Sequence, residues 1–209
     1  MKSIVASFLF LFFIVGACRY PRPTPVNYTN IYIQIDSVKK MLRNGDVILR
    51  NGNDEVSQAA RSFNRIDTSY SHCGLVLIEN DTHYVYHALG GSYNPSQKLM
   101  RQIVDSFSNP VHNVALGVYR YKLDTVQLQT LRTIIHQYYQ QGLRFDLFFN
   151  LETDDEMYCA EFVFKSLNQA MHNSLTPYLK KDSEPFGITL DDLFLHPNCQ
   201  LVTRVSYKY

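Results

Sequence analysis

Apolar residues recur at helical spacing in the segment that follows the acidic run 154–156. The recurring positions are Ala160, Val163, Phe164, Leu167 and Met171. Steps of three and four residues predict one buried face of an amphipathic helix. The acidic run suits the start of such a helix, where the macrodipole favours negative charge. Cys159 then falls in the first turn, where unpaired backbone N–H groups stabilise a thiolate.

Residues 72–78 and 83–88 predict the two strands of a hairpin. Both are rich in β-branched and aromatic residues, and the turn-forming run 79–82 separates them. A turn centred on Asn80-Asp81 sets Ile78 opposite His83.

This register makes a further prediction about the faces of the hairpin. Gly74 lies opposite His87, and because side chains alternate, His72, Gly74, His83 and His87 share one face. His72 is then the diagonal neighbour of His87, roughly 7–8 Å away. Gly74 is expected to leave the space above this face open.

The remaining pattern predicts an α+β fold, a mostly antiparallel sheet with helices packed on it. Further strands are expected at 47–49, 98–104, 114–121 and 201–207, and further helices at 36–43, 53–63, 124–142 and 190–193. The helix after Asn53 is expected to bury Val56, Ala59, Ala60 and Phe63. Asp124 and Gln127 form a capping box for the long helix, which Gly142 ends.

The N-terminus resembles the leader of a bacterial lipoprotein. Lys2 precedes the apolar run 4–14, which is short for a membrane span. The run ends in Val15-Gly16-Ala17-Cys18, which resembles a lipobox. A plain signal peptide or an anchor helix is the alternative.

The lipoprotein interpretation divides the chain into three parts. Residues 1–17 are a signal peptide, 18–30 a tether lipidated at Cys18, and 31–209 one domain. Arg19 in place of aspartate favours the outer membrane, on its periplasmic side. The formal net charge of +1 gives no reason to expect a nucleic-acid partner.

Lipidation of Cys18 would leave three cysteines, Cys73, Cys159 and Cys199. An odd number in an oxidising compartment leaves at least one free thiol. A Cys73–Cys199 disulfide is one option, and two small buried apolar residues are the other.

Cys159 at a helix start and His72 on a strand are the residue types of a nucleophile and its general base. The base takes the thiol proton and returns it to the leaving group. The backbone N–H of Cys159 is the first expected oxyanion donor. From spacing alone, a cysteine in a helix and a histidine in a strand are more often packing residues than catalytic ones.

The order of the motifs resembles the circularly permuted, YiiX-like branch of the NlpC-type papain-like cysteine hydrolases. The segments are Gly45-Asp46, Ser71-His72-Cys73-Gly74-Leu75-Val76, Tyr86-His87-Ala88, Phe145-Asp146 and Tyr158-Cys159-Ala160-Glu161-Phe162-Val163. The resemblance covers about residues 42–195 and implies Cys159 as nucleophile, His72 as base and His87 as the third, orienting residue. Many relatives carry glutamate at that third position, so Glu79 and Glu161 are alternative orienters.

The resemblance implies an amide substrate, with peptidoglycan peptides first. A second candidate is acyl-lipid chemistry of the lecithin:retinol acyltransferase type, and a third is a non-catalytic binding lipoprotein. The aromatic residues Tyr93, Phe145, Phe148, Phe149 and Phe186 would form either an apolar substrate pocket or core. No cofactor is expected; a zinc site at the cysteine and histidines and a Ca²⁺ site at residues 154–156 are weaker alternatives.

Overall fold

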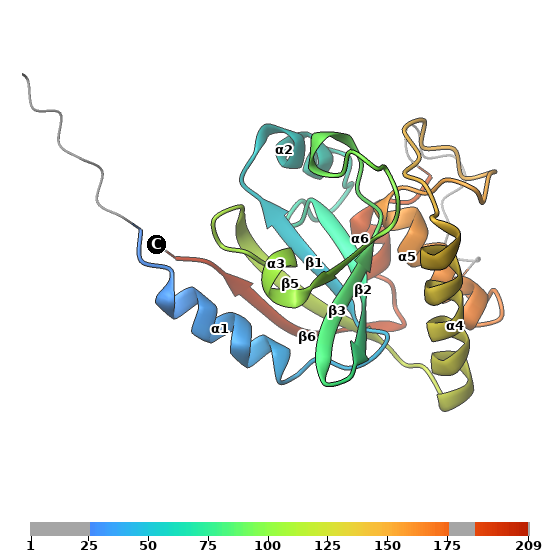
Figure 1. The fold of residues 1–209 in the computed structure, drawn as a ribbon, viewed down its shortest axis with the longest axis horizontal. Helices are drawn as coiled ribbons and strands as arrows, with labels where there is room; N and C mark the ends of the chain where they lie inside the picture. Colours follow the sequence, from blue (N-terminus) through green and yellow to red (C-terminus); the bar gives the residue numbers. More distant parts are fainter. Residues whose placement is uncertain (1–25, 176–186, 209) are drawn as a thin grey trace, which may run out of the picture.

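A six-stranded sheet forms the centre of the structure (Figure 1), a computed structural model that describes residues 26–175 and 187–208. The strands are β1 (Val47–Gly52), β2 (His72–Glu79), β3 (Thr82–His87), β4 (Met100–Ile103), β5 (Asn113–Tyr121) and β6 (Cys199–Ser206). Their spatial order is β4-β3-β2-β1-β5-β6, and every neighbouring pair is antiparallel. The predicted α+β class with a mostly antiparallel sheet is confirmed.

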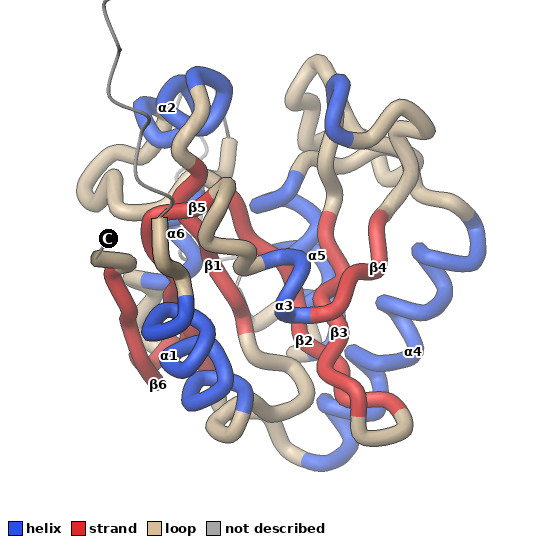
Figure 2. Tube along the Cα trace, turned by 60° about the vertical axis from the view of Figure 1, so that its left-hand side comes forward, coloured by secondary structure: helices blue, strands red, loops and turns tan. Residues whose placement is uncertain are grey.

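Helices cover both faces of this sheet. They are α1 (Thr29–Lys39), α2 (Glu55–Ser62), α3 (Val104–Phe107), α4 (Thr125–Gln141), α5 (Cys159–Ala170) and α6 (Leu190–Phe194), with a 3₁₀ turn, η1, at Gly91–Tyr93. In Figures 1 and 2, α4 and α5 lie on one side of the sheet and α1 and α3 on the other. Two apolar clusters fill these layers: Leu75 and Leu77 pack with Phe162 of α5, and Val76 packs with Phe107 of α3.

The N-terminal predictions lie largely outside the described residues. This applies to the signal peptide, to Cys18 and to the tether up to residue 25. Thr29 and Asn30, which were expected in the tether, instead form the first turn of α1. No helix in the described ranges is long and apolar enough to cross a bilayer.

The predicted hairpin register is confirmed. Ile78 pairs with His83, and Asn80 and Asp81 turn the chain with φ angles of 47° and 61°. The prediction of open space above Gly74 is wrong. A Cβ on Gly74 would lie 2.6 Å from a Val85 methyl and 2.9 Å from the His87 Cβ. The glycine therefore lets β3 approach β2 closely where His87 sits.

The prediction for helix α4 is confirmed, whereas the prediction for helix α2 is partly wrong. Helix α4 has the expected capping box of Asp124 and Gln127, and Gly142 ends it with φ 69°. Helix α2 is capped by Asp54, not Asn53, and contains no buried residue. Its apolar side, expected in the core, instead lines a cavity at the end of the sheet.

The Gly45-Asp46 motif has a structural role. Asp46 is fully buried, and its carboxylate accepts hydrogen bonds from the Arg120 guanidinium at 2.6 and 2.8 Å and from the Arg43 backbone N–H at 2.8 Å. This arrangement ties the entry to β1 to strand β5.

Arg120→Gln is therefore expected to lower the free energy of unfolding by about 3 kcal/mol, because it leaves a buried carboxylate without its ionic partner. Urea denaturation measures this change. Arg132→Gln, on the exposed side of α4, is the matched control and should change stability by less than about 0.5 kcal/mol. Equal losses in the two variants would contradict this role for the pair.

Candidate active site

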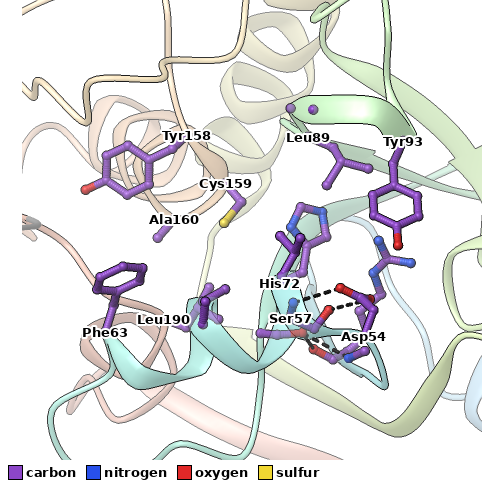
Figure 3. Close-up of a pocket in the computed structure, with 18 of the residues that line it drawn as sticks. Asp54, Ser57, Phe63, His72, Leu89, Tyr93, Tyr158, Cys159, Ala160 and Leu190 are labelled. Carbon is purple, nitrogen blue, oxygen red and sulfur yellow. Dashed lines mark hydrogen bonds between the residues drawn. The ribbon is translucent and has the colours of Figure 1, made fainter.

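A cavity of about 560 Å³ lies at the end of the sheet where the last residues of β1, the first residues of β2 and the start of α5 meet (Figure 3). Cys159 and His72 both line it, although 87 positions separate them in the chain. Cys159 is partly exposed and His72 is 6% exposed. The structure therefore brings the expected nucleophile and the expected base to one cavity.

His72 and His87 are joined by a hydrogen bond between His72 Nε2 and His87 Nδ1, 2.8 Å long. The other nitrogen of His87, Nε2, lies 3.2 Å from Oε1 of Gln102. An amide oxygen only accepts, so His87 Nε2 carries a hydrogen and His87 Nδ1 accepts from His72 Nε2–H. This chain leaves the lone pair of His72 on Nδ1, where it can accept a proton.

Both histidines are held in the neutral form. Burial lowers the pKa of His72 well below its usual value, and the positive charge of Arg50 lowers it further. The same two causes lower the pKa of His87 to about 3. Phe107 packs its ring against both imidazoles, with centroids 5.8 Å and 5.2 Å away. The site therefore holds a hydrogen-bonded pair of neutral imidazoles and not a carboxylate–imidazolium pair.

Cys159 begins α5, as predicted, and its surroundings favour the thiolate. Its pKa is lowered mainly by a hydrogen bond from the Cys73 thiol, and further by the backbone N–H groups of Ala160, Cys73 and Cys159, while burial acts in the opposite direction. Cys73, adjacent to His72 in β2, points to the α5 side of the sheet. No hydrogen bond joins the Cys159 sulfur to the His72 ring in the described ranges, and such contacts are often long before substrate binds.

The three thiols of the described residues are all free, so the Cys73–Cys199 disulfide is not formed. Cys73 is fully buried and its pKa is raised, while burial raises the pKa of Cys199 to about 12.

Iodoacetamide at pH 7 is therefore expected to alkylate Cys159 at least about tenfold faster than Cys73 or Cys199, since the thiolate is the reactive form. Peptide mass mapping over a time course gives the three rates. Denatured protein is the control and should react at all three positions. Similar rates at the three positions in folded protein would contradict an activated Cys159.

The alternative orienting carboxylates lie elsewhere. Glu79 binds the Tyr86 hydroxyl, His136 and Arg101 near the hairpin turn. Glu161 is fully buried, accepts the Tyr158 N–H at 3.3 Å and pairs with Lys165 at 2.9 Å.

Burial raises the pKa of Glu161 to about 7. Neither this glutamate nor Glu79 contacts His72, so His87 alone of the three expected orienters is bonded to it.

Two residues of the site were not predicted from the sequence, namely Gln102 on β4 and Arg50 on β1. Both line the cavity, as does His112. Strand alternation would have revealed Gln102 and Arg50 only if the strand pairing had been known, because Gln102 pairs with Val85 and Arg50 pairs with His72.

The other expected positions have ordinary surroundings. Phe145 and Phe149 line the cavity with Tyr93, whereas Phe148 is 87% exposed and Phe186 lies outside the described residues. Asp154 pairs with Lys165. Of the other residues of the acidic run, Asp155 is exposed and Glu156 pairs with Arg144, and His83 of the hairpin is half-buried.

Comparison with known proteins identifies the family and supports the fold. The model of the permuted papain-like amidase family (YaeF/YiiX, C92) matches residues 41–183. The fold is similar to the crystal structure of YiiX from Escherichia coli O157:H7, with a TM-score of 0.62 and 20% sequence identity over 80% of this chain and 99% of that chain. No curated protein matches the sequence.

That YiiX structure is described as a metalloprotein. Among residues 26–175 and 187–208 of the present chain, no group of three or more His, Cys, Asp or Glu side chains is placed to hold a metal ion. The two imidazoles of the cavity are bonded to one another and to an amide, which does not fit a metal site.

Since the family match spans more than half of the sequence, the protein belongs to the permuted papain-like amidases and is a cysteine hydrolase.

Proposed function

We propose that the protein is a lipid-anchored, extracytoplasmic thiol hydrolase that cleaves amide bonds of peptidoglycan peptides through an acyl-enzyme on Cys159. The observation that best supports catalysis by a cysteine and a histidine is a hydrogen-bonded chain from Gln102 through His87 to His72. This chain ends at the cavity that Cys159 also lines. The family supports amide hydrolysis. The lipobox-like sequence at Cys18 supports the location.

In this mechanism His72 Nδ1 takes the proton of the Cys159 thiol, and the sulfur attacks the carbonyl carbon of the substrate amide. The amine leaves with the proton from His72, which gives a thioester. Water, deprotonated by the same nitrogen, then attacks the thioester and releases the acid. His87 holds the His72 ring in one tautomer through both half-reactions.

The negative oxygen of the tetrahedral intermediate needs donors close to the sulfur. The backbone N–H groups at the start of α5 already point at the Cys159 sulfur, and the N–H of Cys159 is the first donor in this proposal. A donor of this kind contributes about 2.7–4 kcal/mol to the transition state.

His87→Glu is expected to move the acid limb of kcat/KM upward by about 1–3 pH units, because a carboxylate stabilises the imidazolium of His72. His72 must be neutral to accept the thiol proton, and its pKa is depressed in the native protein, so activity should fall only well below pH 6.5. In the glutamate variant the fall should begin at higher pH. His87→Gln, which adds no charge, is the control and should leave the limb in place; an equal shift in both variants would contradict the neutral imidazole pair.

Muropeptides and acyl-lipid vesicles, each incubated with the full chain, distinguish the substrate classes. Mass spectrometry of released amines and acids gives the bond that is cut. Cleavage of muropeptides supports the proposal, and cleavage of lipid alone overturns it in favour of the second candidate. Turnover of neither, together with an unreactive Cys159, would favour a binding protein.

The second candidate, an acyl-lipid hydrolase or acyltransferase, is supported by the apolar wall of the cavity. Helix α2 turns Val56, Ala60 and Phe63 toward it, and Phe149 and Ile188 line the same space. Val56 is 68% exposed and Phe63 41% exposed, so these side chains have apolar surface that an acyl chain would cover.

The location has its own test. Radiolabelled palmitate fed to expressing bacteria should be incorporated into the native chain and not into Cys18→Ser, since lipidation needs the thiol. Equal incorporation, or none in the native chain, would contradict lipidation at Cys18.

A further inference from the structure

Arg50 is a cationic side chain in the wall of the catalytic cavity. It lies on β1 directly opposite His72, so both side chains are on the same face of the sheet. Its guanidinium donates one hydrogen bond to the Phe107 carbonyl at 3.2 Å and lies 4.9 Å from the centre of the Phe107 ring. A guanidinium carries five N–H donors, so most of its capacity remains available.

Five other arginines of the described ranges are neutralised by carboxylates. The pairs are Arg65–Asp192, Arg101–Glu79, Arg120–Asp46, Arg144–Glu156 and Arg204–Asp67. Arg50 has no carboxylate within 4.0 Å among residues 26–175 and 187–208. Arg50 is the one arginine of the described residues that lines the cavity. A ligand bound in the cavity can therefore supply the carboxylate that Arg50 lacks.

Asp54 is the carboxylate that acts most strongly on Arg50, but it is used elsewhere. Its two oxygens accept the Ser57 backbone N–H at 2.9 Å and the Ser57 hydroxyl at 2.9 Å, which caps α2. Burial outweighs its attraction and lowers the pKa of Arg50. A largely buried cation without a carboxylate in contact is unfavourable, and an anion bound beside Arg50 would offset that penalty.

The side chains that line the cavity differ in polarity on the two sides of Cys159 and His72. Figure 3 shows Phe63 and Leu190 on one side of Cys159 and His72. Tyr93 lies on the opposite side, and its phenol and the Arg50 guanidinium both line the cavity. A substrate lying across the sulfur would therefore place an apolar group on the first side and a polar or anionic group on the second.

We infer that Arg50 forms an anion subsite, which binds a carboxylate next to the scissile amide while an apolar group of the substrate covers the opposite wall. The inference rests on the proposed amide hydrolysis and narrows its substrate class. A guanidinium binds a carboxylate through two parallel N–H···O bonds, so the subsite would also fix the position of the amide relative to Cys159.

Binding of two matched probes tests the subsite without turnover. The probes are N-hexanoyl-alanine and N-hexanoyl-alaninamide, which differ only in having a carboxylate or a carboxamide. Calorimetric titration of full-length Cys159→Ala should show the acid binding about 10- to 100-fold more tightly, the range for a hydrogen bond to a charged group. Adding Arg50→Gln should reduce the ratio to within about threefold, and Arg50→Lys should give an intermediate ratio because lysine keeps the charge without the fork.

Arg132→Gln in the same background is the matched control and should keep the full preference, since Arg132 is exposed on α4. Equal binding of the two probes to protein that retains Arg50, or no binding of either probe up to its solubility limit, would overturn the subsite even if Arg50→Gln failed to fold. A preference that survives in folded Arg50→Gln would overturn it as well. Because no bond is cut in this assay, failure of the hydrolase proposal would show separately, in the turnover experiment.

Discussion

Replacing Cys159 with alanine is expected to lower kcat/KM for amide hydrolysis by a factor of about 10⁴ or more, the loss typical of removing a catalytic nucleophile. The sulfur forms the covalent bond in the proposed mechanism, and alanine has no atom that can replace it. The fold should persist because the N-terminal cap of α5 comes from Glu161, whose carboxylate accepts the Tyr158 N–H. Steady-state kinetics on a cleaved amide, with urea denaturation in parallel, measures both effects.

Cys199→Ala provides the matched control for this loss. Cys199 starts β6, lines no part of the cavity and carries a thiol with a raised pKa. Its removal should change kcat/KM by less than about twofold. If Cys159→Ala kept more than a tenth of the native rate, Cys159 would not be the nucleophile.

His72→Gln is expected to lower kcat/KM by about 10²- to 10⁴-fold, the contribution typical of a general base. The helix start cannot replace the base. Lowering a thiol pKa from about 8.5 to about 6 raises the thiolate fraction roughly thirtyfold at neutral pH, and the loss of nucleophilicity takes back about tenfold. The small net gain means that proton transfer through His72 must supply most of the rate.

The matched control for His72→Gln is His83→Gln. His83 lies on the same hairpin, pairs with Ile78 near the turn as predicted, and does not line the cavity. Its substitution should change kcat/KM by less than about twofold. Comparable losses in the two variants would mean that the hairpin affects activity through stability and that His72 is not the base.

The features that local patterns determine were predictable. The hairpin register follows from a two-residue turn, since the side-chain period of a strand is two and the turn length fixes which residues face each other. The register placed His72 near His87 before any long-range pairing was known, and the hydrogen bond of 2.8 Å agrees with it. The start of α5 at Cys159 likewise follows from apolar spacing and the acidic run before it.

The features that depend on long-range pairing were not predictable. Twelve residues separate β3 from β4, so the sequence does not determine that Gln102 comes within 3.2 Å of His87. Arg50 meets His72 only through the pairing of β1 with β2. Helix α2 has a strongly amphipathic sequence, but amphipathicity does not distinguish a helix packed on the core from one that borders a cavity.

Mass spectrometry of the acid-quenched enzyme is the most direct test of an acyl-enzyme on Cys159. The tryptic peptide 145–165 contains Cys159 as its single cysteine. During turnover of an amide or activated ester, this peptide should gain the mass of the substrate acyl group, and hydroxylamine should remove it because thioesters are labile. Steady turnover with no adduct on this peptide, or with the acyl group on another residue, would contradict the account.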